Sequence, residues 1–235
     1  MNLEEIIKNY HMSDEAHAVV QKTKLLLIAS IAGGGKDTVV KELVKTGNFH
    51  RIVSHTTRSP RSNHGILEKD GIDYHFIDQK GATELLQEQA FVEAKYVHGN
   101  IYGTSVTEVE QAFTENKVAV TDIDIQGVVE YLGVKPDTHA VFLLPPSVDT
   151  WLDRLSRRYD GNLSDHEEEL KKRFRTAYDE IKHIQADERF VLIINDDLQT
   201  TVKRVLDVLD GSVSRTSGYA DKVTEHLIDY LESQV

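Results

Sequence analysis

The sequence contains no cysteine and no long apolar segment, and both absences restrict what the protein is. Without cysteine the chain has no disulfide framework, no catalytic thiolate and no cysteine-ligated metal. The longest apolar run near the start, LLLIASIA at 25–32, is far too short to cross a bilayer. Acidic residues stand near the N-terminus, where a signal peptide would be basic. We therefore expect a soluble, cytoplasmic protein without a membrane partner.

Positive charge is scarce as well. The chain has 27 Lys and Arg against 39 Asp and Glu, a formal net charge of −12. Such an excess of negative charge disfavours a general nucleic-acid surface, so phosphate binding needs locally clustered basic residues. The 11 histidines are scattered and form no HExxH motif. We expect them to be surface or core residues rather than metal ligands.

Apolar runs of strand length alternate with helical patterns along most of the chain. The runs predict strands at 25–30, 118–125, 139–146 and 190–195. This alternation predicts an α/β fold, a parallel sheet with helices on both faces. Residues 54–105 are polar and interrupted by Gly and Pro, which indicates a small mixed-β region inserted into that core.

The two ends carry amphipathic helical patterns of their own. Residues 1–22 predict a helical extension, and 211–235 predict a linker followed by an amphipathic helix. The main domain is expected at 23–210, with its core at 23–53 and 106–210. The apolar stripes of the ends are candidates for packing on this core or for homo-oligomer formation.

A glycine-rich segment, SIAGGGKDT at 30–38, follows the first predicted strand and precedes a helix. Successive glycines let backbone N–H groups approach a phosphate, and the helix N-terminus adds positive potential. Lys36 supplies a charge to the outer phosphates. Two positions depart from the G-x-x-x-x-G-K-[ST] pattern, because Ser30 replaces Gly and Asp37 replaces the hydroxyl residue that contacts Mg²⁺. Either Asp37 ligates the metal itself or Thr38 does.

Several further motifs in the same order resemble the guanylate kinase family of nucleoside monophosphate kinases. They are VSHTTRSPR at 53–61, DGIDYHF at 70–76, FVEAKYVHGNIYGTS at 91–105 and DIDIQG at 122–127. The resemblance runs from about Lys24 to Leu209. It implies a P-loop core, a GMP-binding insertion, a helical lid at about 154–173, and transfer of a phosphoryl group from ATP to GMP or dGMP with Mg²⁺.

The resemblance implies three sets of site residues. The GMP-binding set is Ser54, Arg58, Arg61, Glu68, Tyr74, Glu93, Tyr102, Thr104 and Asp124. The ATP-binding set is Ser30, Ile31, Ala32, Gly33, Gly34, Gly35, Lys36, Asp37, Thr38 and Asn195. The catalytic cations are Lys36, Arg58, Arg154, Arg158 and Arg173, and the metal donors are Asp37, Thr38 and Asp122.

These roles suit the chemistry of the residues. Arg58 and Arg61 favour bidentate contacts to a phosphate. The carboxylate of Glu93 accepts from the N1–H and N2–H₂ donors of guanine. Asp122 and Asp124 are two apart on the strand predicted at 118–125, so they are expected to project to one face.

One position of the GMP loop is ambiguous in the sequence. Three residues after the second arginine the family has Glu, where this chain has His64 within a longer loop. Shifting the motif past about four extra residues places Glu68 there, and we prefer Glu68.

Two other functions compete with a guanylate kinase. Guanylate-kinase-like domains in scaffold proteins bind protein partners without catalysis, but such a loss should erode Lys36 and the arginines first. A P-loop kinase for another phosphorylated small molecule would not need the base-reading set Ser54, Glu93 and Thr104.

Overall fold

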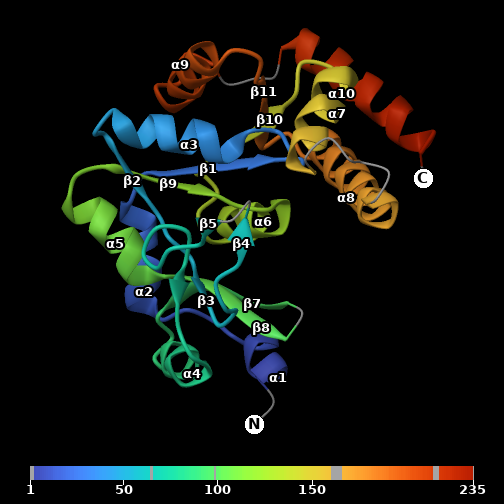
Figure 1. The fold of residues 1–235 in the computed structure, drawn as a ribbon. Helices are drawn as coiled ribbons and strands as arrows, with labels where there is room; N and C mark the ends of the chain where they lie inside the picture. Colours follow the sequence, from blue (N-terminus) through green and yellow to red (C-terminus); the bar gives the residue numbers. More distant parts are fainter. Residues whose placement is uncertain (1–2, 64–65, 98, 160–165, 214–216, 235) are drawn as a thin grey trace. The chain divides into compact units, whose positions relative to one another are not determined.

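The computed structural model describes residues 3–63, 66–97, 99–159, 166–213 and 217–234, which form an α/β chain (Figure 1). The helices are α1 (Leu3–Lys8), α2 (Asp14–Lys22), α3 (Lys36–Lys45), α4 (Gln79–Gln87), α5 (Val106–Thr114), α6 (Ile125–Val134), α7 (Val148–Arg158), α8 (Glu167–Ala186), α9 (Leu198–Leu209) and α10 (Gly218–Glu232). The strands are β1 (Leu25–Ser30), β2 (Phe49–Arg51), β3 (His55–Thr56), β4 (Ser62–Asn63), β5 (Ile66–Leu67), β6 (His75–Phe76), β7 (Phe91–Val97), β8 (Asn100–Ser105), β9 (Val118–Asp122), β10 (His139–Leu144) and β11 (Phe190–Ile194).

The main sheet has five strands in the order β11-β10-β1-β9-β2, and the pairs β1–β10, β10–β11 and β2–β9 are parallel. A second sheet, in the order β6-β3-β8-β7, mixes parallel and antiparallel pairs. The predicted α/β class with an inserted mixed-β region is therefore confirmed.

The chain divides into two compact units. Unit 1 comprises residues 1–25, 47–121 and 129–138, and unit 2 comprises residues 26–46, 122–128 and 139–235. The boundaries predicted from the sequence, with a core, an insertion and a lid, stay a prediction.

Unit 2 is built around strands that are buried on both faces. All six residues of β1 are buried, as are five of the six of β10. Continuous apolar runs of this kind are typical of parallel strands covered by helices. The carboxyl ends of β1 and β10 lie in register, with Ser30 opposite Leu143. Loops that leave this edge of the sheet are where an open α/β fold binds ligands.

Both terminal segments pack within the unit to which they belong. In unit 1, Leu3, Ile6 and Ile7 of α1 pack on a buried cluster that includes Leu86 and Phe91. In unit 2, α10 lies against α7 and α8 (Figure 1) and buries residues such as Leu227 and Leu231. The apolar stripe predicted at the C-terminal end is thus covered within the chain and that of α1 is partly covered, and homo-oligomer formation stays a prediction.

The structure differs from the sequence-based elements chiefly in two places. Helix α4 was not expected within 54–105, because Gly81 in its first turn disfavours a helix. Its N-cap Asp78 accepts from the Gly81 N–H at 2.7 Å. The strand predicted at 118–125 ends at Asp122, and α6 begins at Ile125. Among the described residues, no helix combines the length and apolarity needed to span a membrane.

Candidate active site

The glycine segment forms the turn between β1 and α3 in unit 2. Gly33 and Gly35 adopt φ values of +81° and +89°, which L side chains rarely take. A Cβ at Gly34 would lie 2.5 Å from the Cβ of Ser30. The missing side chain at position 34 therefore makes room for the side chain that this loop carries at Ser30. The first departure from the motif is accommodated by local packing.

Two side chains from elsewhere in unit 2 form hydrogen bonds with the glycine loop, and a third bonds the backbone of one of these two residues. The Asn195 amide donates to the Gly34 carbonyl at 2.7 Å, and the Trp151 indole N–H donates to the Ala32 carbonyl at 2.8 Å. Arg154 donates to the Asn195 carbonyl at 2.8 Å. Sequence reasoning placed Asn195 near adenine, which stays a prediction, and it missed Trp151. The only signal for Trp151 was that it is the one tryptophan in the chain.

The predicted metal donors lie at the carboxyl ends of β1 and β9. Asp37 and Thr38 are exposed on the first turn of α3, and Asp122 is the last residue of β9. The prediction that Asp122 and Asp124 project from one strand face is wrong, because β9 ends at Asp122. The Asp124 carboxylate instead accepts from the Gly127 N–H at 2.7 Å, at the start of α6. Across the described part of the chain, no group of three or more His, Cys, Asp or Glu is placed to hold a metal ion.

Sequence reasoning also missed Glu180, a half-buried carboxyl on α8 that interacts electrostatically with Lys36. Burial raises the pKa of Glu180 to about 7; Lys36 opposes this rise, whereas Asp124 and Asp179 add to it. Lys36, the lysine predicted to contact the outer phosphates, therefore interacts with a carboxyl group whose pKa is raised toward neutral pH.

This carboxyl group gives a testable pH dependence of stability. The folded protein holds the Glu180 proton more tightly than the unfolded chain, so Glu180 lowers the free energy of unfolding as pH rises from about 4.5 to about 7. Glu180→Gln should remove this loss, which amounts to at most about 3 kcal/mol. Urea unfolding at pH 5 and pH 8 measures it: the variant should gain clearly more stability over wild type at pH 8 than at pH 5. An equal difference at both pH values would contradict the raised pKa.

The predicted lid arginines are only partly described. Arg154 lies on α7, and its Nη1 is buried without a hydrogen-bond partner in the described structure. Arg173 on α8 forms an ion pair with Glu169 at 2.6 Å and donates to the Tyr159 hydroxyl. Arg158 ends α7. The turn at 160–165 lies outside the described residues.

In unit 1, Arg58 and Glu68 form a buried ion pair. The Glu68 carboxylate accepts from both terminal nitrogens of Arg58, at 2.8 and 3.1 Å, and from the Arg61 N–H at 2.7 Å. Burial opposes the charge on Glu68, but these donors outweigh it and lower its pKa. Glu68 therefore joins the two arginines of the VSHTTRSPR motif, whereas His64 lies outside the described residues.

Two tyrosines lie beside this ion pair. The Arg58 guanidinium lies 5.3 Å from the centre of the Tyr74 ring, and the Tyr74 and Tyr102 rings meet edge to face at 6.1 Å. Arg58 Nε is buried without a hydrogen-bond partner in the described structure. A partly unsatisfied guanidinium beside two phenol groups suits an anion with several oxygen acceptors.

The three predicted base-reading residues also come together in unit 1. Glu93 on β7 pairs with Thr104 on β8, and the Ser54 and Thr104 hydroxyls are 3.4 Å apart. Tyr131 is fully buried nearby; burial raises its pKa, and the negative charge of Glu93 raises it further. The ninth residue of the predicted GMP set, Asp124, belongs to unit 2.

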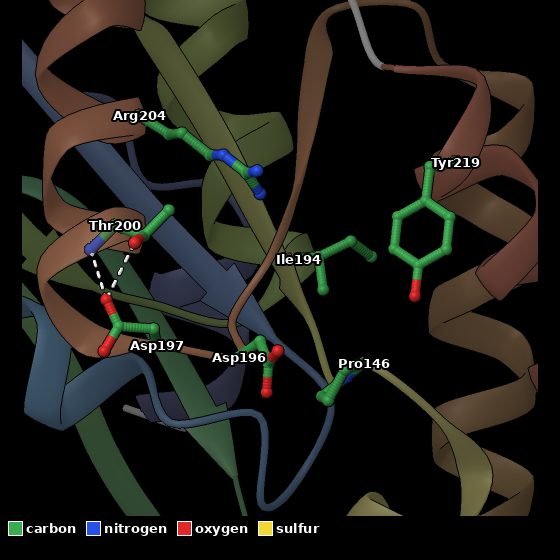
Figure 2. A pocket seen from close by; sticks show the side chains of 7 residues that line it. All are labelled: Pro146, Ile194, Asp196, Asp197, Thr200, Arg204 and Tyr219. Atoms are coloured by element: carbon green, nitrogen blue, oxygen red, sulfur yellow. Dashed lines mark hydrogen bonds between the residues drawn. The ribbon is translucent and has the colours of Figure 1, made fainter.

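Unit 2 also has a pocket of about 200 Å³ beside Asn195 (Figure 2). It is lined by Pro146, Ile194, Asp196, Asp197, Thr200, Arg204 and Tyr219. Figure 2 shows Arg204 and Tyr219 extending from α9 and α10 on opposite sides of Ile194. Asp197 already accepts from the Thr200 N–H and hydroxyl, at 2.8 and 2.7 Å. None of the glycine-loop residues lines this pocket.

Comparisons with known proteins show the family to which the chain belongs. The family model described as guanylate kinase matches residues 21–212. A guanylate kinase of Schizosaccharomyces pombe is 36% identical over 190 residues, covering 80% of this chain and 90% of the relative. A guanylate kinase of Clostridioides difficile is 32% identical over 207 residues, covering 88% and 96%. The crystal structure of guanylate kinase from Anaplasma phagocytophilum matches with a TM-score of 0.59 at 25% identity, covering 88% of this chain and 96% of that one. This chain therefore belongs to the guanylate kinase family.

Proposed function

We propose that unit 1 binds GMP or dGMP, that unit 2 binds ATP, and that the γ-phosphoryl group passes from ATP to the acceptor phosphate. As a guanylate kinase, the chain is an ATP-dependent GMP phosphotransferase. The observation that carries the residue assignments is the grouping in unit 1: Glu93 and Thr104 are paired across two strands, Ser54 lies beside them, and Arg58 lies beside Tyr74.

The acceptor phosphate carries two negative charges, and the proposed residues supply matching donors. Arg58 and Arg61 contact the phosphate, with Glu68 holding both arginines at the same place. The hydroxyls of Tyr74 and Tyr102 donate to the same oxygens. Glu93 accepts from the guanine ring N–H and amino group, while Ser54 and Thr104 complete the contacts to the base.

The donor phosphates lie on the glycine loop. Backbone N–H groups of residues 33–38 and the N-terminus of α3 favour the negative charge, and Lys36 contacts the outer phosphates. Arg154 and Arg173 stabilise the charge that develops on the transferred group. Arg154 Nη1 is buried and has no hydrogen-bond partner among the described residues, which supports this role because a buried guanidinium nitrogen favours an acceptor.

Mg²⁺ fits the oxygen donors that unit 2 provides. Asp37, Thr38 and Asp122 offer two carboxylates and a hydroxyl, and Mg²⁺ in kinases is held by one or two carboxylates together with substrate phosphates. When bound, it neutralises negative charge on the phosphates. We propose Asp37 as a direct ligand, with Thr38 as the alternative, and Asp122 as a ligand through water.

No protein nucleophile is needed for this reaction. An oxygen of the acceptor phosphate attacks the γ-phosphorus in line, and ADP leaves. The residues of the chain orient the two nucleotides and stabilise charge.

A coupled assay of ADP release tests the proposal. With Mg·ATP we expect turnover of GMP and dGMP at about 1–100 s⁻¹, and little with AMP, UMP or CMP. No turnover with any acceptor would overturn it and leave a partner-binding domain or a kinase for another substrate; calorimetry with GMP separates those two.

In the same assay Asp37→Ser should shift the dependence of the rate on Mg²⁺ and Mn²⁺. An unchanged metal profile would leave Thr38 as the ligand.

A further inference from the structure

Tyr10 lies outside the region that matches the family model, residues 21–212, yet it contacts the strand that carries Glu93. Its hydroxyl donates to the Phe91 carbonyl at 2.7 Å and accepts from the Phe91 N–H at 2.8 Å. Its ring meets the Phe91 ring edge to face at 6.5 Å. One side chain thus satisfies both backbone groups of a residue two positions before Glu93.

The strand pairing is irregular at this point. Phe91 pairs with Ser105 and Glu93 with Thr104, two residues that are adjacent on β8. Val92 is therefore an extra residue on β7, which forms a β-bulge. A bulge of this kind leaves backbone groups outside the ladder and changes the direction of the side chains that follow it. The Tyr10 hydroxyl forms hydrogen bonds with the N–H and carbonyl groups of Phe91, at the start of this bulge.

The N-terminal segment is anchored on both sides of Tyr10. Ile6 and Ile7 pack against the buried cluster around Phe91, and the Ser13 N–H donates to the Gln89 carbonyl at 3.2 Å. The phenol is partly buried: burial raises the pKa of Tyr10 to about 12, against the lowering effect of the Phe91 bond, and the nearby Glu93 charge adds to the rise. Tyr10 therefore lies close enough to Glu93 to interact with its charge.

We propose that Tyr10 is a positioning residue for the guanine-reading carboxylate, fixing the Phe91–Glu93 bulge so that Glu93 meets the purine edge. This inference rests on the proposed role of Glu93. A residue that only stabilises the fold would affect the free energy of unfolding, whereas a residue that positions Glu93 also affects discrimination between bases.

Comparing GMP with IMP measures that discrimination, because IMP keeps the ring N–H but lacks the 2-amino group. Tyr10→Phe removes only the hydroxyl. We expect the ratio of kcat/KM for GMP to that for IMP to fall about fivefold or more, the scale of one hydrogen bond, while the KM for ATP stays unchanged. Tyr96→Phe, the same change at an exposed position on β7, should leave the ratio unchanged.

Two further variants separate the ways in which the inference can fail. Glu93→Gln should lower the same ratio more than Tyr10→Phe; if it does not lower the ratio at all, the proposed role of Glu93 is wrong. If Glu93→Gln lowers it and Tyr10→Phe does not, the inference about Tyr10 is overturned. Leu3→Ala removes apolar packing at the other end of α1 and should reduce thermal stability without changing the ratio. An equal fall in the ratio for Leu3→Ala would assign the effect to stability and also overturn the inference.

Discussion

Replacing Lys36 with Met should lower kcat by about 10²–10³-fold, the scale for loss of one preorganised charge-stabilising donor. Lys36 is the first residue of α3, directly after the glycine loop, and among the described residues its side chain interacts electrostatically with Glu180. The change breaks no hydrogen bond or ion pair between the Lys36 side chain and another described residue, so it tests the proposed contact with the outer phosphates of ATP. Steady-state kinetics with saturating Mg·ATP and GMP measure the effect.

Lys41→Met is the matched control, because Lys41 is exposed on the same helix and five residues further on. Its kcat should stay close to that of wild type. Thermal melting of both variants checks that the fold is retained. A Lys36→Met enzyme with more than a tenth of wild-type kcat would contradict the role of the loop lysine.

Arg58→Met is the second change with a large expected effect, and it acts on both binding and stability. The Arg58 and Glu68 side chains are only 9% and 12% exposed, so the substitution leaves a buried carboxylate that keeps the Arg61 N–H but loses its charged partner. Breaking such a pair costs about 3 kcal/mol of folding stability. Loss of a bidentate contact to the phosphate should raise the KM for GMP about 100-fold or more.

A double variant separates these two effects of Arg58. Arg58→Met with Glu68→Gln removes the unpaired charge and should recover much of the stability, but it should not restore the KM for GMP. Arg157→Met breaks an exposed ion pair with Asp153 and should change neither quantity appreciably. If the double variant recovered GMP binding together with stability, Arg58 would be a structural residue and not a phosphate ligand.

The sequence by itself determined the fold class and most of the local elements. Buried parallel strands read as continuous apolar runs, and a glycine turn before a helix has a local signature, so β1, α3, β10 and β11 were predictable. Glu68 was also preferred over His64 because of the resemblance to the family's motif, and in the structure its carboxylate accepts from the Arg58 guanidinium and the Arg61 N–H. These features depend on residues that are close in sequence.

Only the tertiary structure decided the features that join distant segments. Trp151 supports the loop at Ala32 across 119 residues, and Tyr10 reaches Phe91 across 81. The proximity of Glu180 to Lys36 is likewise set by how α8 packs within unit 2. The prediction for Asp124 was wrong because a strand ends where its backbone groups lose their partners, which the sequence does not show. The Asp124 carboxylate instead accepts from the Gly127 N–H at the start of α6. Spacing fixes which side chains share a face, whereas pairing and packing fix where each strand stops and which side chains meet.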